Sequence, residues 1–178
     1  MQRITFIPFG ETADHSIDFL LGAIEDARIT TVGSVIGMPK EKLHWQYAEG
    51  WNTIGALLSH IICVRHYFRI YFLEGRELTA VEEAAYLPGL EMGKYIPDLI
   101  TDDEIEVYLE RLDESNKLLV KAVSELSTEQ FFAKRKEYNP NTGCNLAWVI
   151  YHVAEDEVNH RGQINLIKKL YKTNHPTV

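Results

Sequence analysis

Hydrophobic residues recur at intervals of three and four along four stretches of the chain, which is the spacing of one buried helix face. The four stretches cover residues 14–36, 52–74, 101–126 and 145–170. The third begins with Thr101-Asp102-Asp103-Glu104, a pattern typical of a capping box at a helix N-terminus. The pattern therefore predicts an all-α protein with four long helices.

The connections predict how these helices are arranged. Residues 75–100 are too long for a tight turn between antiparallel neighbours, so they indicate a crossover between parallel ones. Residues 127–141 contain a short turn at 127–130 and lead to a loop at 139–143, and nothing in them is typical of a strand. Four helices with one long crossover, between the second and the third, form a four-helix bundle whose interior can host a metal site.

Composition sets limits on size and location. A chain of 178 residues with 46% hydrophobic residues is long enough for one core and short for two, so we expect a single domain over residues 1–178. No stretch approaches the roughly 20 apolar residues that a membrane span needs, and residues 1–14 lack the apolar centre of a signal peptide. Two cysteines without a repeated spacing, Cys63 and Cys144, favour a soluble protein in the reducing cytoplasm.

The charge of the chain limits its partners. Acidic residues outnumber basic ones by 26 to 18, which gives a formal net charge of −8. Because nucleic-acid phosphates would be repelled and no run of Lys or Arg offsets this, we do not expect nucleic-acid binding. We expect a small-molecule substrate and no membrane partner.

The fourth stretch carries polar side chains where core residues belong. At about 100° per residue, one arc of this helix holds His152, Asp156, Asn159, His160 and Gln163 together with Trp148, Val149, Leu166, Ile167 and Leu170. We interpret this arc as the inward face, and we interpret the opposite side as the solvent face, with Arg161, Asn165, Lys168, Lys172 and the nearby Glu157. An aspartate buried between imidazoles must be paired or coordinated. A metal ion meets that need, and so does an ion-free network in which the carboxylate bridges the imidazoles.

The second helix offers a further ligand in His60, which shares a face with Ala56 and Val64. Taken alone, such a histidine is more often a hydrogen-bonded core residue than a metal ligand. Two histidines and a carboxylate from two helices would leave coordination positions open, as in a catalytic site. The candidates for orienting the imidazoles are then Glu155, Asn159 and Gln163.

The segment 152–164, together with Ser59-His60, resembles the DinB/YfiT-like superfamily of metal-binding four-helix bundles, and the likeness covers nearly the whole chain. The usual ligands of that family are one histidine in the second helix and two histidines four residues apart in the last. The resemblance therefore implies His60, Asp156 and His160 as ligands, with aspartate in place of the middle ligand. Carboxylate can bind Zn, Ni, Fe or Mn and shifts the preference toward harder ions. One turn earlier, His152 is a candidate additional or replacement ligand.

Members of the superfamily include transferases and isomerases that use bacillithiol, mycothiol or related small thiols, together with metal-dependent hydrolases. The resemblance implies a metal-dependent thiol S-transferase, in which the ion holds a thiol cosubstrate as thiolate, or a hydrolase, in which water takes its place. Homodimers are frequent in the superfamily, so we expect a homodimer. The competing hypothesis is a non-enzymatic, stress-related helical bundle whose polar core is structural or vestigial.

Overall fold

The computed structural model describes residues 14–135, 141 and 143–176. Within them the helices are α1 (His15–Val35), α2 (Lys40–Leu43), α3 (Ile54–Phe68), the π-helical turn η1 (Arg69–Leu73), α4 (Ala80–Glu91), the 3-10 turn η2 (Gly93–Tyr95), α5 (Ile96–Leu99), α6 (Ile105–Ser124), α7 (Thr128–Phe132) and α8 (Leu146–Asn174). No strand forms in this part of the chain, where Arg135 and Cys144 make an isolated bridge. The predicted all-α class is confirmed. Asn139, Pro140 and Thr142 of the expected loop lie outside the described residues.

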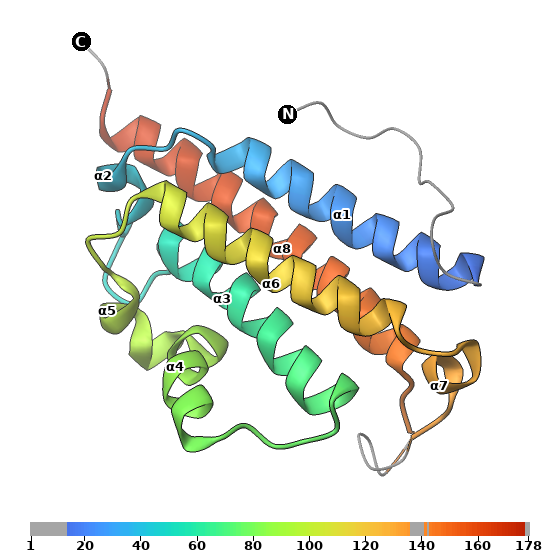
Figure 1. The fold of residues 1–178 in the computed structure, drawn as a ribbon. Coiled ribbons are helices and arrows are strands. Elements are labelled where there is room, and N and C mark those ends of the chain that lie inside the picture. The colour runs from blue at the N-terminus through green and yellow to red at the C-terminus, as the bar shows by residue number, and fades with distance from the viewer. Residues whose placement is uncertain (1–13, 136–140, 142, 177–178) are drawn as a thin grey trace.

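The four longest helices, α1, α3, α6 and α8, lie side by side in a bundle (Figure 1). Helices α1 and α8 run in one direction, and α3 and α6 run in the other. The connection from α3 to α6 therefore joins parallel neighbours, as the sequence predicts. None of the helices in the described ranges is long and apolar enough to cross a membrane.

Side-chain caps set where three of the long helices begin. The Asp14 carboxylate accepts the Ser16 N–H at 2.7 Å, the Thr53 hydroxyl accepts the Ala56 N–H at 3.0 Å, and the Asn145 side chain accepts the Trp148 N–H at 2.9 Å. Each cap satisfies a backbone donor that has no partner inside the helix. The caps of α3 and α8 thereby fix the starting points of the two helices that carry the candidate ligands.

The predicted capping box at 101–104 is wrong. Helix α6 begins one turn later, at Ile105, and its N-cap Glu104 makes no capping hydrogen bond through its side chain. The acidic residues of the segment have other partners, since Asp102 pairs with Lys40 at 2.7 Å and Asp103 lies 3.4 Å from Arg111. Tertiary ion pairs have replaced the local capping bonds that the pattern suggested.

A capping box forms instead at the start of α4, inside the crossover. The Thr79 hydroxyl accepts the Glu82 N–H, and the Glu82 carboxylate accepts the Thr79 N–H at 2.8 Å. This Thr-x-x-Glu spacing is a helix-start signal in the sequence. The crossover is therefore not an open loop, because α4 folds within it and packs along α3 (Figure 1).

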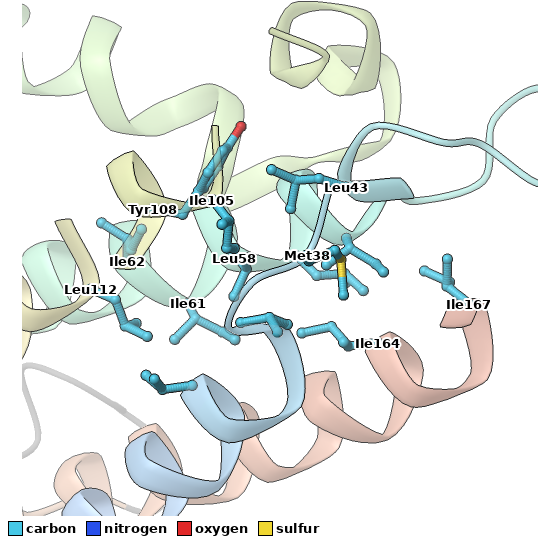
Figure 2. Close-up of a cluster of buried hydrophobic side chains, with 14 residues drawn as sticks. Met38, Leu43, Leu58, Ile61, Ile62, Ile105, Tyr108, Leu112, Ile164 and Ile167 are labelled. Carbon is cyan, nitrogen blue, oxygen red and sulfur yellow. The ribbon is translucent and has the colours of Figure 1, made fainter. Parts of the chain in front are cut away.

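Two clusters of buried apolar side chains fill the bundle. One lies where α1 ends and α3 begins and includes Met38, Leu43, Leu58, Ile61 and Ile164 (Figure 2). The other lies toward the opposite end and includes Ile17, Ile24, Leu119, Phe131 and Ile150. Between the two clusters, each of α1, α3, α6 and α8 contributes buried polar residues to a polar layer, which includes Thr31, Arg65, Ser115, Asn116 and Glu157.

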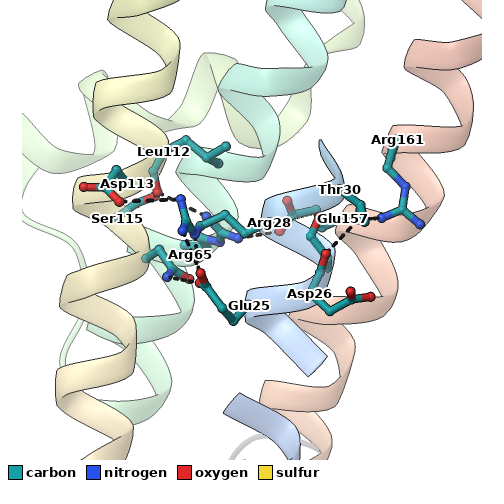
Figure 3. Close-up of polar contacts among 12 residues, drawn as sticks. Glu25, Asp26, Arg28, Thr30, Arg65, Leu112, Asp113, Ser115, Glu157 and Arg161 are labelled. Atoms are coloured by element: carbon teal, nitrogen blue, oxygen red, sulfur yellow. Dashed lines mark hydrogen bonds and ion pairs between the residues drawn. The ribbon is translucent and has the colours of Figure 1, made fainter. Parts of the chain in front are cut away.

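The centre of the polar layer is a buried ion pair between Arg65 of α3 and Glu157 of α8 (Figure 3). Their side chains are 0% and 1% exposed. The Arg65 guanidinium also donates to the Leu112 carbonyl at 3.2 Å. Nearby, Arg28 makes two hydrogen bonds to Glu25, at 2.7 and 2.8 Å. Arg28 also lies 3.5 Å from Asp113 of α6. Polar contacts thus join α3 to α8 and α6, and α1 to α6.

This layer corrects the sequence interpretation of α8. Glu157, expected near solvent, is buried, and Arg161 donates to the Thr30 hydroxyl of α1. Trp148 and Leu166, expected to face inward, are 51% and 50% exposed. The error arose because a charged residue with a buried partner has the same pattern in the sequence as one that faces water.

We expect Arg65→Met to lower the free energy of unfolding by about 3–5 kcal/mol, because it leaves the Glu157 charge buried without a partner. The double variant Arg65→Met/Glu157→Leu should lose less of the free energy of unfolding, because it leaves no unpaired charge in the core. Urea denaturation measures both. Arg111→Met is the matched control, because Arg111 is an exposed member of an ion pair and its loss should cost at most about 1 kcal/mol. A cost for Arg65→Met as small as that of the control would contradict this account.

Candidate metal centre

Three side chains predicted to be ligands meet between α3 and α8. Nε2 of His60 lies 3.5 Å from Oδ2 of Asp156, and Nε2 of His160 lies 3.2 Å from Oδ1 of the same carboxylate. The two imidazole centroids are 4.6 Å apart and their planes are tilted by 71°. Asp156 and His160 are one turn apart on α8, so both project toward His60 of α3.

A backbone carbonyl of the crossover holds His60 in place. Nδ1 of His60 lies 2.9 Å from the carbonyl oxygen of Gly89 in α4 and must donate to it, because a carbonyl only accepts. In the neutral ring, Nε2 then carries the lone pair and faces Asp156. This contact was not predicted from the sequence, in which residues 75–100 indicated only a crossover between parallel helices.

Glycine at position 89 allows α4 to approach α3 this closely. A Cβ there would lie 2.5 Å from Sγ of Cys63 and 3.2 Å from the Ser59 carbonyl oxygen. Such contacts are too short for any ordinary side chain. The absence of a side chain is therefore what brings the Gly89 carbonyl within hydrogen-bonding distance of His60.

The three side chains are largely but not fully buried. The exposed fractions of the His60, Asp156 and His160 side chains are 13%, 17% and 8%. Burial by itself lowers the pKa of His60, but hydrogen bonds with Asp156 and Gly89 outweigh it and raise that pKa above its usual value. Burial also opposes ionisation of Asp156, yet the two imidazoles hold its pKa well below its usual range. The centre therefore carries an ionised carboxylate near neutral pH.

A divalent cation fits this donor set. Two imidazole nitrogens and a carboxylate are ligands for Zn, Ni, Fe and Mn, and the ligand atoms lie within 4.8 Å of one another. In a tetrahedral site, ligand atoms about 2.1 Å from the ion are about 3.4 Å apart, close to the two nitrogen-to-oxygen distances. Nδ1 of His160 is buried with no hydrogen-bond partner among the described residues, so the ring's only polar contact is at Nε2, toward the carboxylate. Partial exposure leaves one side open to water or substrate.

The other predicted site residues do not join this cluster. His152 stacks on Trp148, with centroids 5.1 Å apart, and its Nδ1 lies 3.1 Å from Glu155. Asn159 is exposed on α8. Gln163 is half-buried one turn beyond His160 and lines a recess there. The ion-free alternative placed the Asp156 carboxylate between His152 and His160, but in the structure this carboxylate contacts His60 and His160.

Comparison with models of known protein families gives a match over most of the chain. The family model for the DinB superfamily matches residues 23–164, which is well over half of the chain and includes all three clustered residues. No curated protein matched the sequence.

We expect Gly89→Ala to weaken Zn²⁺ binding roughly 10-fold or more, because the new methyl group pushes α4 away and disturbs the carbonyl that orients His60. Competition with a chromophoric chelator measures the affinity. Gly162→Ala is the control, because a Cβ at that α8 position meets nothing within 4 Å. That variant should keep its Zn²⁺ affinity and gain about 0.5–1 kcal/mol in stability. Equal Zn²⁺ affinities in the two variants would show that the Gly89 contact does not matter.

Proposed function

The chain belongs to the DinB superfamily, and from this membership and the geometry of the centre we propose that it is a metal-dependent enzyme acting on a small molecule. The proposed ligands are His60, Asp156 and His160. The observation that carries the proposal is the convergence of two imidazole nitrogens on the two oxygens of one carboxylate, at a point that remains partly open to solvent.

Each proposed ligand has a separate task. Asp156 supplies a negative charge that offsets part of the charge of a cation. His60, fixed by the Gly89 carbonyl, presents Nε2 from α3, while His160 presents Nε2 from a buried position on α8. A bound divalent cation would act as a Lewis acid and lower the pKa of a coordinated water or thiol.

The chain's own thiol next to this centre is not a suitable nucleophile. Cys63 lies three residues from His60, but its side chain is buried, and burial raises its pKa to about 12. Only the thiolate form of cysteine is nucleophilic. We therefore assign the nucleophile to a small thiol or a water molecule from solvent, which corresponds to an S-transferase or a hydrolase.

The competing hypothesis of a purely structural polar core is less well supported. The Arg65–Glu157 pair and its neighbours already form a buried polar layer between the helices. The His60–Asp156–His160 cluster is a second set of polar side chains, and it is partly exposed. A purely structural role does not require that exposure. The homodimer, the cytoplasmic location and the single domain stay predictions.

The first test is metal content. Protein purified without chelator and incubated with Zn²⁺ should hold about one ion per chain, as expected for a single three-ligand site, and His160→Ala should lose it. His152→Ala is the matched control, because it removes a histidine of the same helix that contacts Glu155 and Trp148 instead. Elemental analysis after gel filtration measures both. Wild-type protein that holds no Zn²⁺, Ni²⁺, Fe²⁺ or Mn²⁺ would refute the proposed enzyme.

Metal uptake should also depend on pH. A ligand nitrogen must lose its proton before it binds an ion, and the pKa of His60 in the metal-free protein is raised. The metal affinity should therefore reach its full value above the pKa of His60 and fall as the pH drops through that pKa. Because this pKa is raised, the fall should begin at a higher pH than for an ordinary histidine. Calorimetric titration in buffers of different ionisation enthalpy should record more protons released at pH 6 than at pH 8. Release that does not change with pH would argue against His60 as a ligand.

A further inference from the structure

A recess lies beside the candidate metal centre, where the segment before α3 meets α8. Its volume is about 320 Å³, and its lining residues are Gly50, Trp51, Asn52, Gln163, Leu166 and Ile167. For comparison, a cavity of roughly 150 Å³ can hold a benzene molecule. The recess therefore has room for a phenyl-sized group with several further atoms.

The recess lies further along the two helices that carry the proposed ligands, and its lining does not include the ligands themselves. On α8, Gln163 and Ile167 follow Asp156 and His160 at steps of three and four residues, so all four share one face. Gln163 lies about 4.5 Å beyond His160 along the helix axis. On the other side, Asn52 comes just before α3, two turns ahead of His60. A substrate whose reacting atom lies at the centre would therefore enter the recess only if it carried a substituent that extends at least one helical turn along α8.

The chemistry of the lining is uncharged. None of its six residues carries a charge, although a quarter of the chain is charged. Trp51 and Leu166, which line the recess, are 44% and 50% exposed overall, and Asn52 and Gln163 supply carboxamides that can donate or accept hydrogen bonds. The nearby lysines Lys168 and Lys169 line a different groove, with Lys42 and Tyr171. A carboxylate or ammonium group in the recess would lose water without gaining a countercharge.

We propose that this recess selects the substrate of the metal centre by binding an uncharged, largely apolar substituent next to the reacting atom. Trp51 and Leu166 provide the apolar contact, and Gln163 accepts or donates one hydrogen bond. This inference rests on the proposed function, because it assumes that the reacting group sits at the ion. It assigns the substrate a neutral aromatic or branched aliphatic substituent rather than a charged one.

Cobalt-loaded protein provides the test, because a thiolate bound to Co²⁺ gives a charge-transfer absorption band that reports binding at the ion. The probes are phenylmethanethiol, the charged mercaptoacetate, and 2-mercaptoethanol as a small neutral reference. The wild type should bind phenylmethanethiol roughly 10-fold more tightly than 2-mercaptoethanol, because burying most of a phenyl ring raises the binding affinity by about that factor. The wild type should bind mercaptoacetate no more tightly than 2-mercaptoethanol.

Trp51→Ala and Leu166→Ser should each remove most of the advantage of phenylmethanethiol and leave the affinity for 2-mercaptoethanol unchanged. Both residues are half exposed, so the fold should tolerate the changes, and circular dichroism checks this. Leu118→Ser is the matched control, because Leu118 is an exposed leucine of α6 that does not line the recess. It should behave as the wild type.

The failures of the two proposals can be told apart. Protein that binds no cobalt refutes the proposed function and this inference with it. Cobalt-loaded protein that binds no probe, prefers mercaptoacetate, or keeps its full preference for phenylmethanethiol in both recess variants overturns this inference alone.

Discussion

The structure depends first on the buried ion pair between Arg65 and Glu157. Each charge would be strongly unfavourable in the core without the other, so α3 and α8 can pack only in the register that brings them together. That register also sets the candidate centre. Glu157 is the residue after Asp156, and Arg65 lies five residues after His60 on α3. A shift of one helix along the other would separate the charges and the three proposed ligands at the same time.

The crossover also contributes to the centre, because α4 contacts His60 in addition to α3 and α8, which carry the ligands. Helix α4 packs on α3 because Gly89 has no side chain, and its carbonyl then fixes the ring of His60. The two faces of the centre therefore differ. The side toward the polar layer is closed and held by charges, whereas further along the same helices, one turn beyond His160, Gln163 and Trp51 line an uncharged recess. A rigid closed side beside an open one is what a site needs in order to hold ligands in place and still admit a substrate.

Much of the fold follows from local patterns. The three-and-four spacing of apolar residues located the four long helices to within a few residues, and the length of residues 75–100 indicated a crossover between parallel neighbours. Local patterns were less reliable for helix starts. The Thr101-Asp102-Asp103-Glu104 motif does not cap α6, because Asp102 pairs with Lys40 of α2 and Asp103 pairs with Arg111 within α6. The same kind of motif at Thr79 does cap α4.

The sequence by itself predicted the four long helices through their local periodicity, and the family resemblance pointed to His60, Asp156 and His160 as the proposed ligands. The sequence could not decide which face of α8 is buried. Glu157 and Arg161 look like solvent-facing charges until their partners on α3 and α1 are known, and Trp148 and Leu166 look like core residues until neighbouring helices are placed. Only the tertiary structure brought the Gly89 carbonyl to His60 and left His152 against Trp148. Whether a polar group is buried and paired depends on contacts between segments that are distant in the chain. Local sequence patterns do not reveal those contacts.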